Sequence, residues 1–257
     1  MSATRIRLIA AARSFVLGIL VAGATAAAAA EVLVISTGVG PPFTTGRRDG
    51  FLDQLLSEAF RRAGARAEML VHESSERALM NSNRGIDDGN APRIKGLEAQ
   101  YPNLVRIPEK LFDNDFVALS LKYRFATPDW KSLEKYHAGY LIGWKIFENN
   151  LGANAGTTKV RDAQQLFSLL RHDRADVILY ERWQGLWRAR ELDMPIAIME
   201  PPLARHEMFC YVNRKHEALV PAVAAALAEM KRDGTYRRIF DATLTPLAPN
   251  GRRTDAD

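Results

Sequence analysis

The sequence predicts an α/β protein built from two successive runs of alternating strands and helices. Short apolar segments rich in β-branched residues recur along the chain, and segments with apolar residues at three- and four-residue spacing lie between them. The alternation restarts after Tyr123, and the 227 residues that follow residue 30 (257 minus 30) are enough for two modest cores. Such alternation is typical of largely parallel sheets covered by helices.

The first run begins with a buried strand and an amphipathic helix. Leu52, Leu55, Leu56, Ala59, Phe60 and Ala63 recur at helical spacing in GFLDQLLSEAFRRAGA, which Gly64 is expected to end. A second helix from Ser74 or Ser75 to about Arg84 has Gly85 as its expected C-cap. PRIKGLEAQY is predicted as a third helix with Pro92 in its first turn. The predicted strands are EVLVIST (31–37), AEMLVHE (67–73), IDD (86–88), LVRIP (104–108) and DFVALSLKY (115–123).

The second run repeats this order. Its predicted strands are AGYLIGW (138–144), DVILYE (176–181), IAIME (196–200) and HEMFCYVN (206–213). Its predicted helices are KIFENNLG, RDAQQLFSLLRHDRA, RWQGLWRARELD and a long closing helix, ALVPAVAAALAEMKRDGTYRRIF, broken at Gly234. Trp183 and Trp187 lie four residues apart, so we expect both to pack onto the sheet.

The first 30 residues have the layout of a secretory signal peptide. Three arginines precede a short apolar run, FVLGILVAG, and small residues with A-x-A cleavage sites end at Ala30. The apolar run is shorter than the roughly 20 residues a membrane span needs. We therefore expect cleavage and a periplasmic, non-membrane-embedded protein.

Charge and cysteine content exclude several classes of protein. Without the three arginines of the first 30 residues, 32 of the 35 Lys and Arg remain against 30 Asp and Glu, which does not indicate a nucleic-acid partner. The single cysteine, Cys210, cannot form an internal disulfide and is predicted to be a core residue. No G-x-S-x-G motif and no metal-binding spacing of the five histidines is present, so no catalytic residue, metal or cofactor is expected.

Ligands of open parallel sheets bind outside the carboxyl ends of the strands, so the loops there are the candidate sites. STGVGPPF (36–43) follows the first strand. Its small residues would let the backbone of Thr37 and its neighbours approach a ligand, and Phe43 could provide an aromatic wall. A plain strand-to-helix loop is an equally good interpretation.

The segment RGIDDGNAPRIKG (84–96) combines two adjacent aspartates with an arginine. On a strand Asp87 and Asp88 would point to opposite faces and could not act as an acid/base pair. His72 and Glu73 could reach them in space, but no metal-binding spacing supports this, and Asp88-Gly89-Asn90 is also good turn chemistry.

Arg93 is the strongest candidate in this segment. A guanidinium together with the amides of a helix start would hold a carboxylate by parallel hydrogen bonds. The alternative is an internal ion pair with an aspartate such as Asp88.

Two strand ends of the second run carry further candidates. Trp144 and Lys145 end one strand, and Tyr180, Glu181 and Arg182 end another. An aromatic ring with mixed charges would suit a zwitterion, with Glu181 accepting its ammonium group. A solvated helix start with the tryptophan packed between elements is the alternative.

The mature chain as a whole resembles the bacterial extracellular solute-binding proteins of family 3, the polar amino-acid type of periplasmic binding protein. The resemblance rests on PPF after the first strand, DGFLDQLLSEAF, IDDGNAPR, PNLVRIPEKLFDNDFVAL and RDAQQLFSLLRHDRADVILYE. Its most specific part is the closing FCYVNRKHEALVPAVAAALAEMKRDGTYRRIF.

The resemblance implies a two-lobed type II periplasmic-binding-protein fold, with the second lobe inserted into the first and two crossing segments as a hinge. The crossings would lie near Ser120–Phe125 and Leu203–Phe209. The implied division is a signal peptide at 1–30, lobe 1 at 31–122, lobe 2 at 123–205, a return to lobe 1 at 206–247, and a flexible tail at 248–257.

The resemblance also implies capture of a small polar ligand for an inner-membrane ABC permease by a monomeric protein. Arg93 matches the family's carboxylate-binding arginine, with Asp88 and Glu181 as acidic contacts. The segment before Arg93 is shorter than in typical members and the one after it is longer, so the ligand could be an amino acid or another small anion or zwitterion. A periplasmic lyase of the cyclohexadienyl dehydratase kind, with Asp88 or Glu181 as general acid, and a ligand sensor for a membrane receptor are the alternatives.

Overall fold

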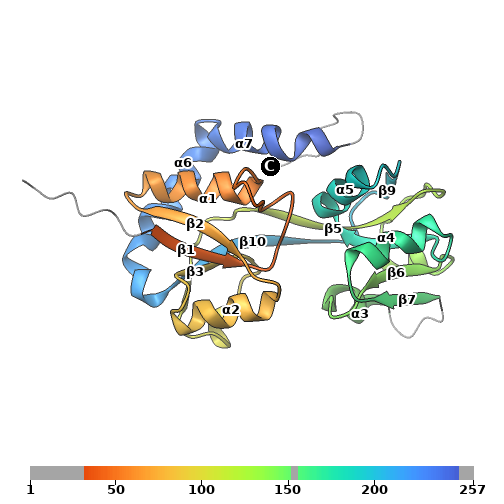
Figure 1. The fold of residues 1–257 in the computed structure, drawn as a ribbon, viewed down its shortest axis with the longest axis horizontal. Helices are drawn as coiled ribbons and strands as arrows, with labels where there is room; N and C mark the ends of the chain where they lie inside the picture. The colour runs from red at the N-terminus through yellow and green to blue at the C-terminus, as the bar shows by residue number, and fades with distance from the viewer. Residues whose placement is uncertain (1–31, 152–155, 249–257) are drawn as a thin grey trace, which may run out of the picture. The chain divides into compact units, whose positions relative to one another are not determined.

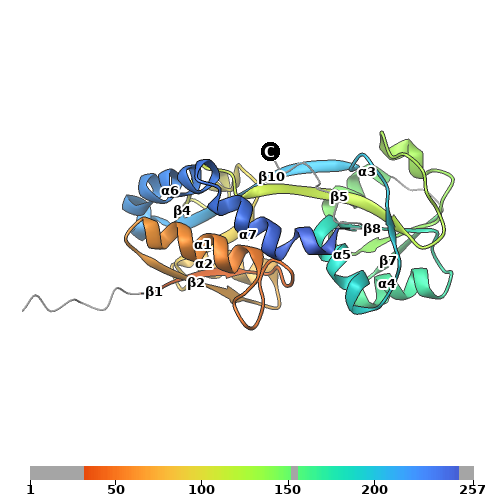
Figure 2. The same cartoon turned by 90° about the horizontal axis from the view of Figure 1, so that it is seen from above.

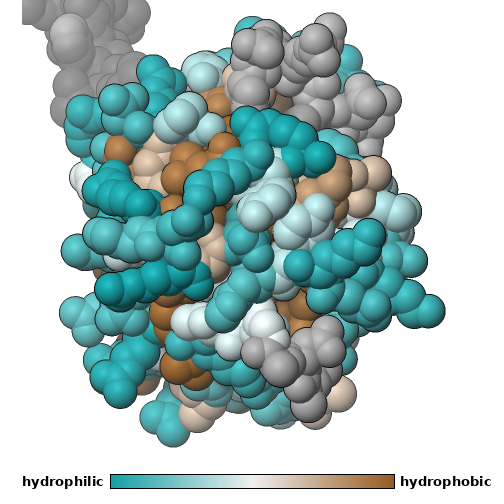
Figure 3. All heavy atoms as spheres, turned by 90° about the vertical axis from the view of Figure 1, so that its right-hand side faces the viewer, coloured by the Kyte–Doolittle hydropathy of each residue, from teal (hydrophilic) through white to brown (hydrophobic). Residues whose placement is uncertain are grey.

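A computed structural model describes residues 32–151 and 156–248 of the chain (Figure 1). The expected signal peptide and nearly all of the expected tail lie outside the described residues. Within these ranges, none of the helices is long and apolar enough to cross a bilayer. Figure 3 shows one face, on which hydrophobic residues form small separate patches among hydrophilic ones.

The described strands join in one ten-stranded sheet with the order β2-β1-β3-β10-β5-β8-β6-β7, with β4 beside β10 and β9 beside β5. The strands are β1 (Val32–Thr37), β2 (Arg66–Val71), β3 (Gly89–Arg93), β4 (Leu104–Arg106), β5 (Phe112–Ser120), β6 (Ala138–Leu141), β7 (Thr157–Val160), β8 (Val177–Glu181), β9 (Ala197–Ile198) and β10 (Ala204–Asn213). The prediction of an α/β protein is confirmed.

Both ends of the sheet are parallel, as the alternation predicts. β1 pairs in parallel with β2 and β3, and β6 pairs in parallel with β7 and β8. The strands between them, β5 and β10, are antiparallel to their neighbours.

Strands β5 and β10 join the two halves of the sheet. Residues Ala204 to Met208 of β10 pair with β5, and the rest of β10 pairs with β3 and β4 (Figure 2). The last residues of β5, from Phe116 to Leu119, pair with β8. We call β1 to β4 with the end of β10 the first half, and β6 to β9 with the end of β5 the second half.

The helices match most of the predicted segments. They are α1 (Phe51–Arg62), α2 (Ser75–Arg84), α3 (Lys145–Leu151), α4 (Ala163–Arg171), α5 (Arg182–Glu191), α6 (Val220–Arg232) and α7 (Thr235–Thr243). Gly85 caps α2 with a φ of 75°, and Gly234, with a φ of 78°, separates α6 from α7. Both positions suit glycine because other residues rarely adopt a positive φ.

Each half of the sheet has its own core. The apolar face of α1 packs with Leu33, Ile35 and Val212 of the first half. Val117, Ile178 and Leu179 of the second half belong to separate clusters that include the buried faces of α3 and α4. Cys210 is fully buried in the first core, and burial raises the pKa of its thiol to about 12.

Two predicted elements are wrong. Residues 92–101 do not form a helix: Pro92 and Arg93 end strand β3, and only Leu97–Ala99 form a 3-10 turn. Residues 86–88 form a turn before β3 rather than a strand. The pairing of β3 with β1 and β10 overrides the helical signal. Pro92 has no backbone N–H to donate, and it is tolerated because the register of β10 shifts beside it.

Trp183 also makes a contact outside the sheet, and its expected packing onto the sheet stays a prediction. Its ring lies edge-on to Phe240 of α7, with centroids 5.4 Å apart, and it belongs to the core of the first half. Helix α5 follows a strand of the second half, so Trp183 connects this helix to the C-terminal segment.

Candidate functional site

The loop after β1 packs against the start of α2. Thr37 is 1% exposed, its hydroxyl accepts a hydrogen bond from Val39 N at 3.1 Å, and its carbonyl accepts one from His72 N at 2.8 Å. A Cβ on Gly38 would lie 2.5 Å from Ser75 Cα. Only glycine therefore permits this approach between the loop and the helix start.

Helix α2 begins at this contact. Ser74 is its N-cap, and the Ser74 hydroxyl accepts a hydrogen bond from Arg77 N at 3.3 Å. The backbone amides of a first helical turn have no partner within the helix and favour negative charge.

Arg93 lies at the carboxyl end of β3 and extends to the start of α2. Its Nη2 donates to the Ser75 carbonyl at 2.7 Å, its Nη1 donates to Ser75 Oγ at 3.3 Å, and its Nε donates to Asn90 Oδ1. The expectation that Arg93 lies in the first turn of a helix is wrong, because Arg93 ends strand β3 and the helix start that it contacts belongs to α2.

No carboxylate among the described residues forms an ion pair with Arg93. Burial lowers the pKa of Arg93, which the charges of Glu76 and Tyr101 only partly offset. A half-buried guanidinium without a counter-ion favours an external anion. Arg93 and Asp88 do not form the ion pair that was the alternative.

Asn90 orients Arg93 and was not predicted from the sequence. Its side chain is fully buried, and its Nδ2 donates to Ser36 Oγ at 3.0 Å. Ser36 Oγ in turn lies 2.8 Å from Ser82 Oγ. These residues lie far apart in the sequence, and no motif marks them, whereas Ser74 and Ser75 could be found as helix-start residues.

Asp88 lies at the other end of β3 from Arg93. Its Oδ1 contacts Lys215 Nζ at 2.7 Å and His216 Nε2 at 2.7 Å, and its Oδ2 accepts from Val34 N at 2.8 Å. Burial works to raise the pKa of Asp88, but these hydrogen bonds outweigh it and lower the pKa. Both oxygens of Asp88 therefore have internal partners, and its expected ligand contact stays a prediction.

His72 does reach the aspartate pair, with its Nε2 3.0 Å from Asp87 Oδ2. The two aspartates contact different partners, as expected, although they lie in a turn and not on a strand. Within the described ranges, no group of three or more His, Cys, Asp or Glu could hold a metal.

Phe43 is a core residue. It is 1% exposed, stacks on Phe112 with centroids 4.9 Å apart and lies edge-on to Phe51 at 6.4 Å. Its ring therefore offers no exposed face, and the expected aromatic wall is not formed by Phe43.

Trp144 and Tyr180 pack together in the second half. The Trp144 ring stacks on Tyr180 at 4.9 Å and on Phe147 at 5.7 Å. Tyr180 is 7% exposed, and burial raises the pKa of its hydroxyl to about 12. This arrangement matches the interpretation of a tryptophan packed between elements.

Glu181 is the N-cap of α5. Its Oε1 accepts from Trp183 N at 3.1 Å and its Oε2 accepts from Gln184 N at 2.7 Å. It is 2% exposed, and burial raises its pKa to about 8 despite these bonds and the charge of Arg182. Both oxygens of Glu181 therefore cap α5, and its expected contact with a ligand ammonium stays a prediction.

A buried ionic network that the sequence did not reveal adjoins Glu181. Arg182, 3% exposed, donates to Asp115 Oδ2 at 3.1 Å and to both carboxylate oxygens of Glu200. Arg205 of β10 donates to both oxygens of Asp115, at 2.6 and 3.0 Å. The network joins α5 to the two strands that link the halves of the sheet.

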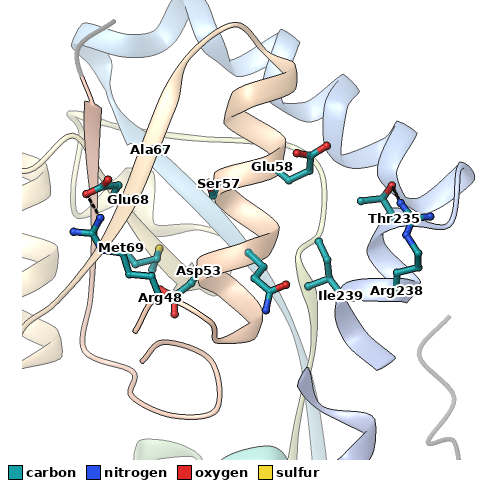
Figure 4. A pocket seen from close by; sticks show the side chains of 11 residues that line it. Arg48, Asp53, Ser57, Glu58, Ala67, Glu68, Met69, Thr235, Arg238 and Ile239 are labelled. Carbon is teal, nitrogen blue, oxygen red and sulfur yellow. Dashed lines mark hydrogen bonds and ion pairs between the residues drawn. The ribbon is translucent and has the colours of Figure 1, made fainter. Parts of the chain in front are cut away.

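A groove of about 610 Å³ lies apart from these residues, between α1, β2 and α7 (Figure 4). Its charged side chains bind one another or the backbone: Arg48 pairs with Glu68 at 2.5 Å, and Asp53 accepts from Thr45 N and Gly50 N. Arg238 donates to Thr235 Oγ1 at 2.7 Å. Arg48, Glu58 and Glu68 of this lining form ion pairs, whereas the partner of Arg238 is a hydroxyl and not a carboxylate.

Comparisons with known proteins support the fold. No family model matches the chain. An uncharacterized protein of Shewanella oneidensis is 25% identical over 162 residues, which are 58% of this chain and 60% of that protein, so the match spans about three fifths of the relative's length.

Solved structures match over most of the chain. The GluR0 ligand-binding core from Nostoc punctiforme in complex with L-glutamate has a TM-score of 0.65 at 15% identity, over 82% of this chain and 98% of that one. The arginine-, lysine-, histidine-binding protein ArtJ from Geobacillus stearothermophilus has a TM-score of 0.63 at 16% identity, over 83% and 94%. The substrate binding protein of an amino acid ABC transporter has a TM-score of 0.63 at 17% identity, over 83% and 99%.

Proposed function

We propose that this chain, which has the two-lobed type II periplasmic-binding-protein fold, is a solute-binding protein that captures a small anionic or zwitterionic ligand. The observation that carries the proposal is Arg93, a half-buried cation at the carboxyl end of a strand without a carboxylate partner among the described residues. A bidentate bond to a ligand carboxylate would supply the missing charge.

The surroundings of Arg93 support the same role. The loop at Gly38 and the start of α2 approach each other closely there, so their backbone amides could join the guanidinium in binding an oxyanion. Asn90 and Ser75 already orient the side chain, which reduces the entropy lost when a ligand binds.

The solved structures that this chain resembles support a cellular role in transport. Structural neighbours include the substrate binding protein of an amino acid ABC transporter. We therefore propose delivery to an inner-membrane permease, with the first 30 residues acting as the export signal and the mature protein acting as a monomer. Arg93, Thr37 and the loop after Thr37 are the proposed ligand contacts.

Catalysis by a dehydratase is less well supported than binding. A general acid must direct a proton at the substrate. The two oxygens of Glu181 accept from backbone N–H groups, and those of Asp88 accept from Lys215, His216 and Val34 N. A ligand sensor would use the same ligand site, but it would bind a membrane receptor and not a permease.

A thermal-shift screen over amino acids and organic acids tests the proposal. A ligand that binds only the folded state stabilises it by about 2.7 kcal/mol at 100 times its Kd, so one compound should raise the Tm. Arg84→Ala changes an exposed arginine on α2 and should retain the shift, whereas Arg93→Ala should lose it. A panel that leaves the Tm of all three proteins unchanged contradicts the proposal.

A further inference from the structure

In an α-amino acid the carboxylate and the ammonium group are attached to the same carbon. A protein that encloses such a ligand must hold the carboxylate with a cation and the ammonium with a nearby acceptor. Arg93 and the first turn of α2 are both electropositive, so an acceptor is needed even more there. The acceptor would have to be a carboxylate that is buried and has no other cation or N–H group bound to it.

Glu181 is the residue that the sequence predicts for the ammonium. Both of its oxygens accept from backbone N–H groups of α5, and the side chain is 2% exposed. Turning it to a ligand would leave two helix amides without partners. Burial also raises its pKa, which weakens it further as a partner for a cation near neutral pH.

Asp88 and Asp115 are also occupied. Asp88 lies before β3, at the end opposite Arg93, and binds Lys215, His216 and Val34 N. Asp115 binds Arg182 and Arg205 with both oxygens. Asp88 is therefore paired with Lys215, and Asp115 with two arginines.

Glu73 follows β2, and Glu76 lies in the first turn of α2, where its charge acts on Arg93. Glu76 accepts from Tyr101 Oη at 3.2 Å, and both glutamates are exposed. An exposed carboxylate gains little from an ion pair because water screens the charge and the side chain loses entropy. Neither therefore provides a buried acceptor beside Arg93.

We propose that the ligand held by Arg93 is a small carboxylate with no ammonium group on its α-carbon, such as an organic acid, and not an α-amino acid. This inference rests on the proposed function and narrows its ligand class. An ammonium group enclosed without an acceptor loses its hydrogen bonds to water and gains none from the protein. This desolvation cost weakens the binding of each amino acid relative to its deaminated analogue.

Calorimetric titration of the purified full-length protein with matched pairs tests the inference. The pairs are glutarate and glutamate, propanoate and alanine, 4-methylpentanoate and leucine, and 3-phenylpropanoate and phenylalanine. At least one deaminated acid should bind tenfold or more tightly than its amino partner, a difference of about 1.4 kcal/mol. Arg93→Ala should abolish that binding, and Glu73→Gln should leave its Kd within about twofold.

Three outcomes separate the inference from the function on which it rests. Tighter binding of any α-amino acid than of its analogue, lost in Arg93→Ala, overturns the inference and leaves the proposed function standing. Weakening of that amino acid by Glu73→Gln or Glu181→Gln would identify the acceptor. Absence of binding by every compound, with wild type and Arg93→Ala alike, overturns both.

Discussion

Asp115 is bound by two arginines in different surroundings. Arg182 is 3% exposed and also binds Glu200, whereas the side chain of Arg205 is 51% exposed. Burial works to lower the pKa of Arg182, but its bonds to Glu200 and Asp115 outweigh burial and raise it. The same carboxylate therefore allows a buried and an exposed ion pair to be compared.

Arg182→Leu should destabilise the protein by about 3 kcal/mol, because it leaves buried carboxylate charge with fewer partners. Arg205→Leu should change stability by about 1 kcal/mol or less, because water screens the pair and Arg182 remains. Urea unfolding of both variants measures the difference. Equal losses would show that burial does not decide the contribution of these arginines.

Glu181 should make stability depend on pH. Its pKa in the folded protein, raised to about 8 from 4.5, means that the folded state holds the proton more tightly than the unfolded chain. The stabilisation is therefore complete below about pH 4.5 and is lost as the pH rises to about 8.

Glu181→Gln removes this titration while keeping an oxygen acceptor for the α5 cap. Relative to this variant, wild type should lose stability between pH 5 and pH 8, by up to about 4 kcal/mol. Urea midpoints at several pH values measure the trend. Parallel profiles of the two proteins would show that Glu181 is ionised throughout.

At the scale of elements, the loop after β1 is fixed by its contact with α2. Gly38→Ala places a methyl group 2.5 Å from Ser75 Cα, whereas a Cβ on Gly40, two residues later, meets nothing within 4 Å. Gly38→Ala should therefore destabilise by about 1 to 3 kcal/mol and weaken ligand binding, since Ser75 also holds Arg93. Gly40→Ala should stay within about 0.5 kcal/mol of wild type in urea unfolding. Similar behaviour of the two variants would contradict the close approach.

Periodicity predicted the elements whose own sequence decides their structure. The apolar spacing in α1, the cap at Gly85 and the break at Gly234 are local signals, and the structure confirms them. Residues 92–101 were predicted wrongly because pairing partners 54 or more residues away decide that β3 continues through Pro92.

The candidate site was predicted less completely than the fold. Arg93 could be singled out because its chemistry is visible in the sequence, and its role stays a prediction. Phe43 is buried because it stacks on Phe112, and Glu181 is occupied because it caps α5. Periodicity predicts helices and strands but does not predict which residues surround a given side chain. Asn90 was missed because its partners Ser36 and Ser82 meet only in the folded chain.

At the scale of the whole molecule, the C-terminal segment adds a third connection between the halves besides β5 and β10. Phe240 of α7 contacts Trp183 of α5, and Arg190 donates to the Pro246 carbonyl at 3.4 Å (Figure 2). The expected hinge of two crossing segments is therefore accompanied by a helix that both halves contact.

A double-mutant cycle measures this connection. Trp183→Leu and Phe240→Leu should show a coupling energy of about 0.5 to 1.5 kcal/mol, because edge-on aromatic pairs contribute beyond their buried area. Phe167→Leu alters the separate core of the second half and should be additive with Phe240→Leu. Additivity in both cycles would mean that α7 does not couple to α5.

In the proposed function, Arg93 holds the anionic group of a small ligand. Calorimetric titration of wild type, Arg93→Ala and Arg84→Ala with the compound that gives the largest thermal shift measures the contribution of Arg93 to binding. Loss of a bidentate charged hydrogen bond should weaken binding by about 100-fold in Arg93→Ala, and Arg84→Ala should bind as wild type does. A Kd for Arg93→Ala within about twofold of wild type would contradict the claim.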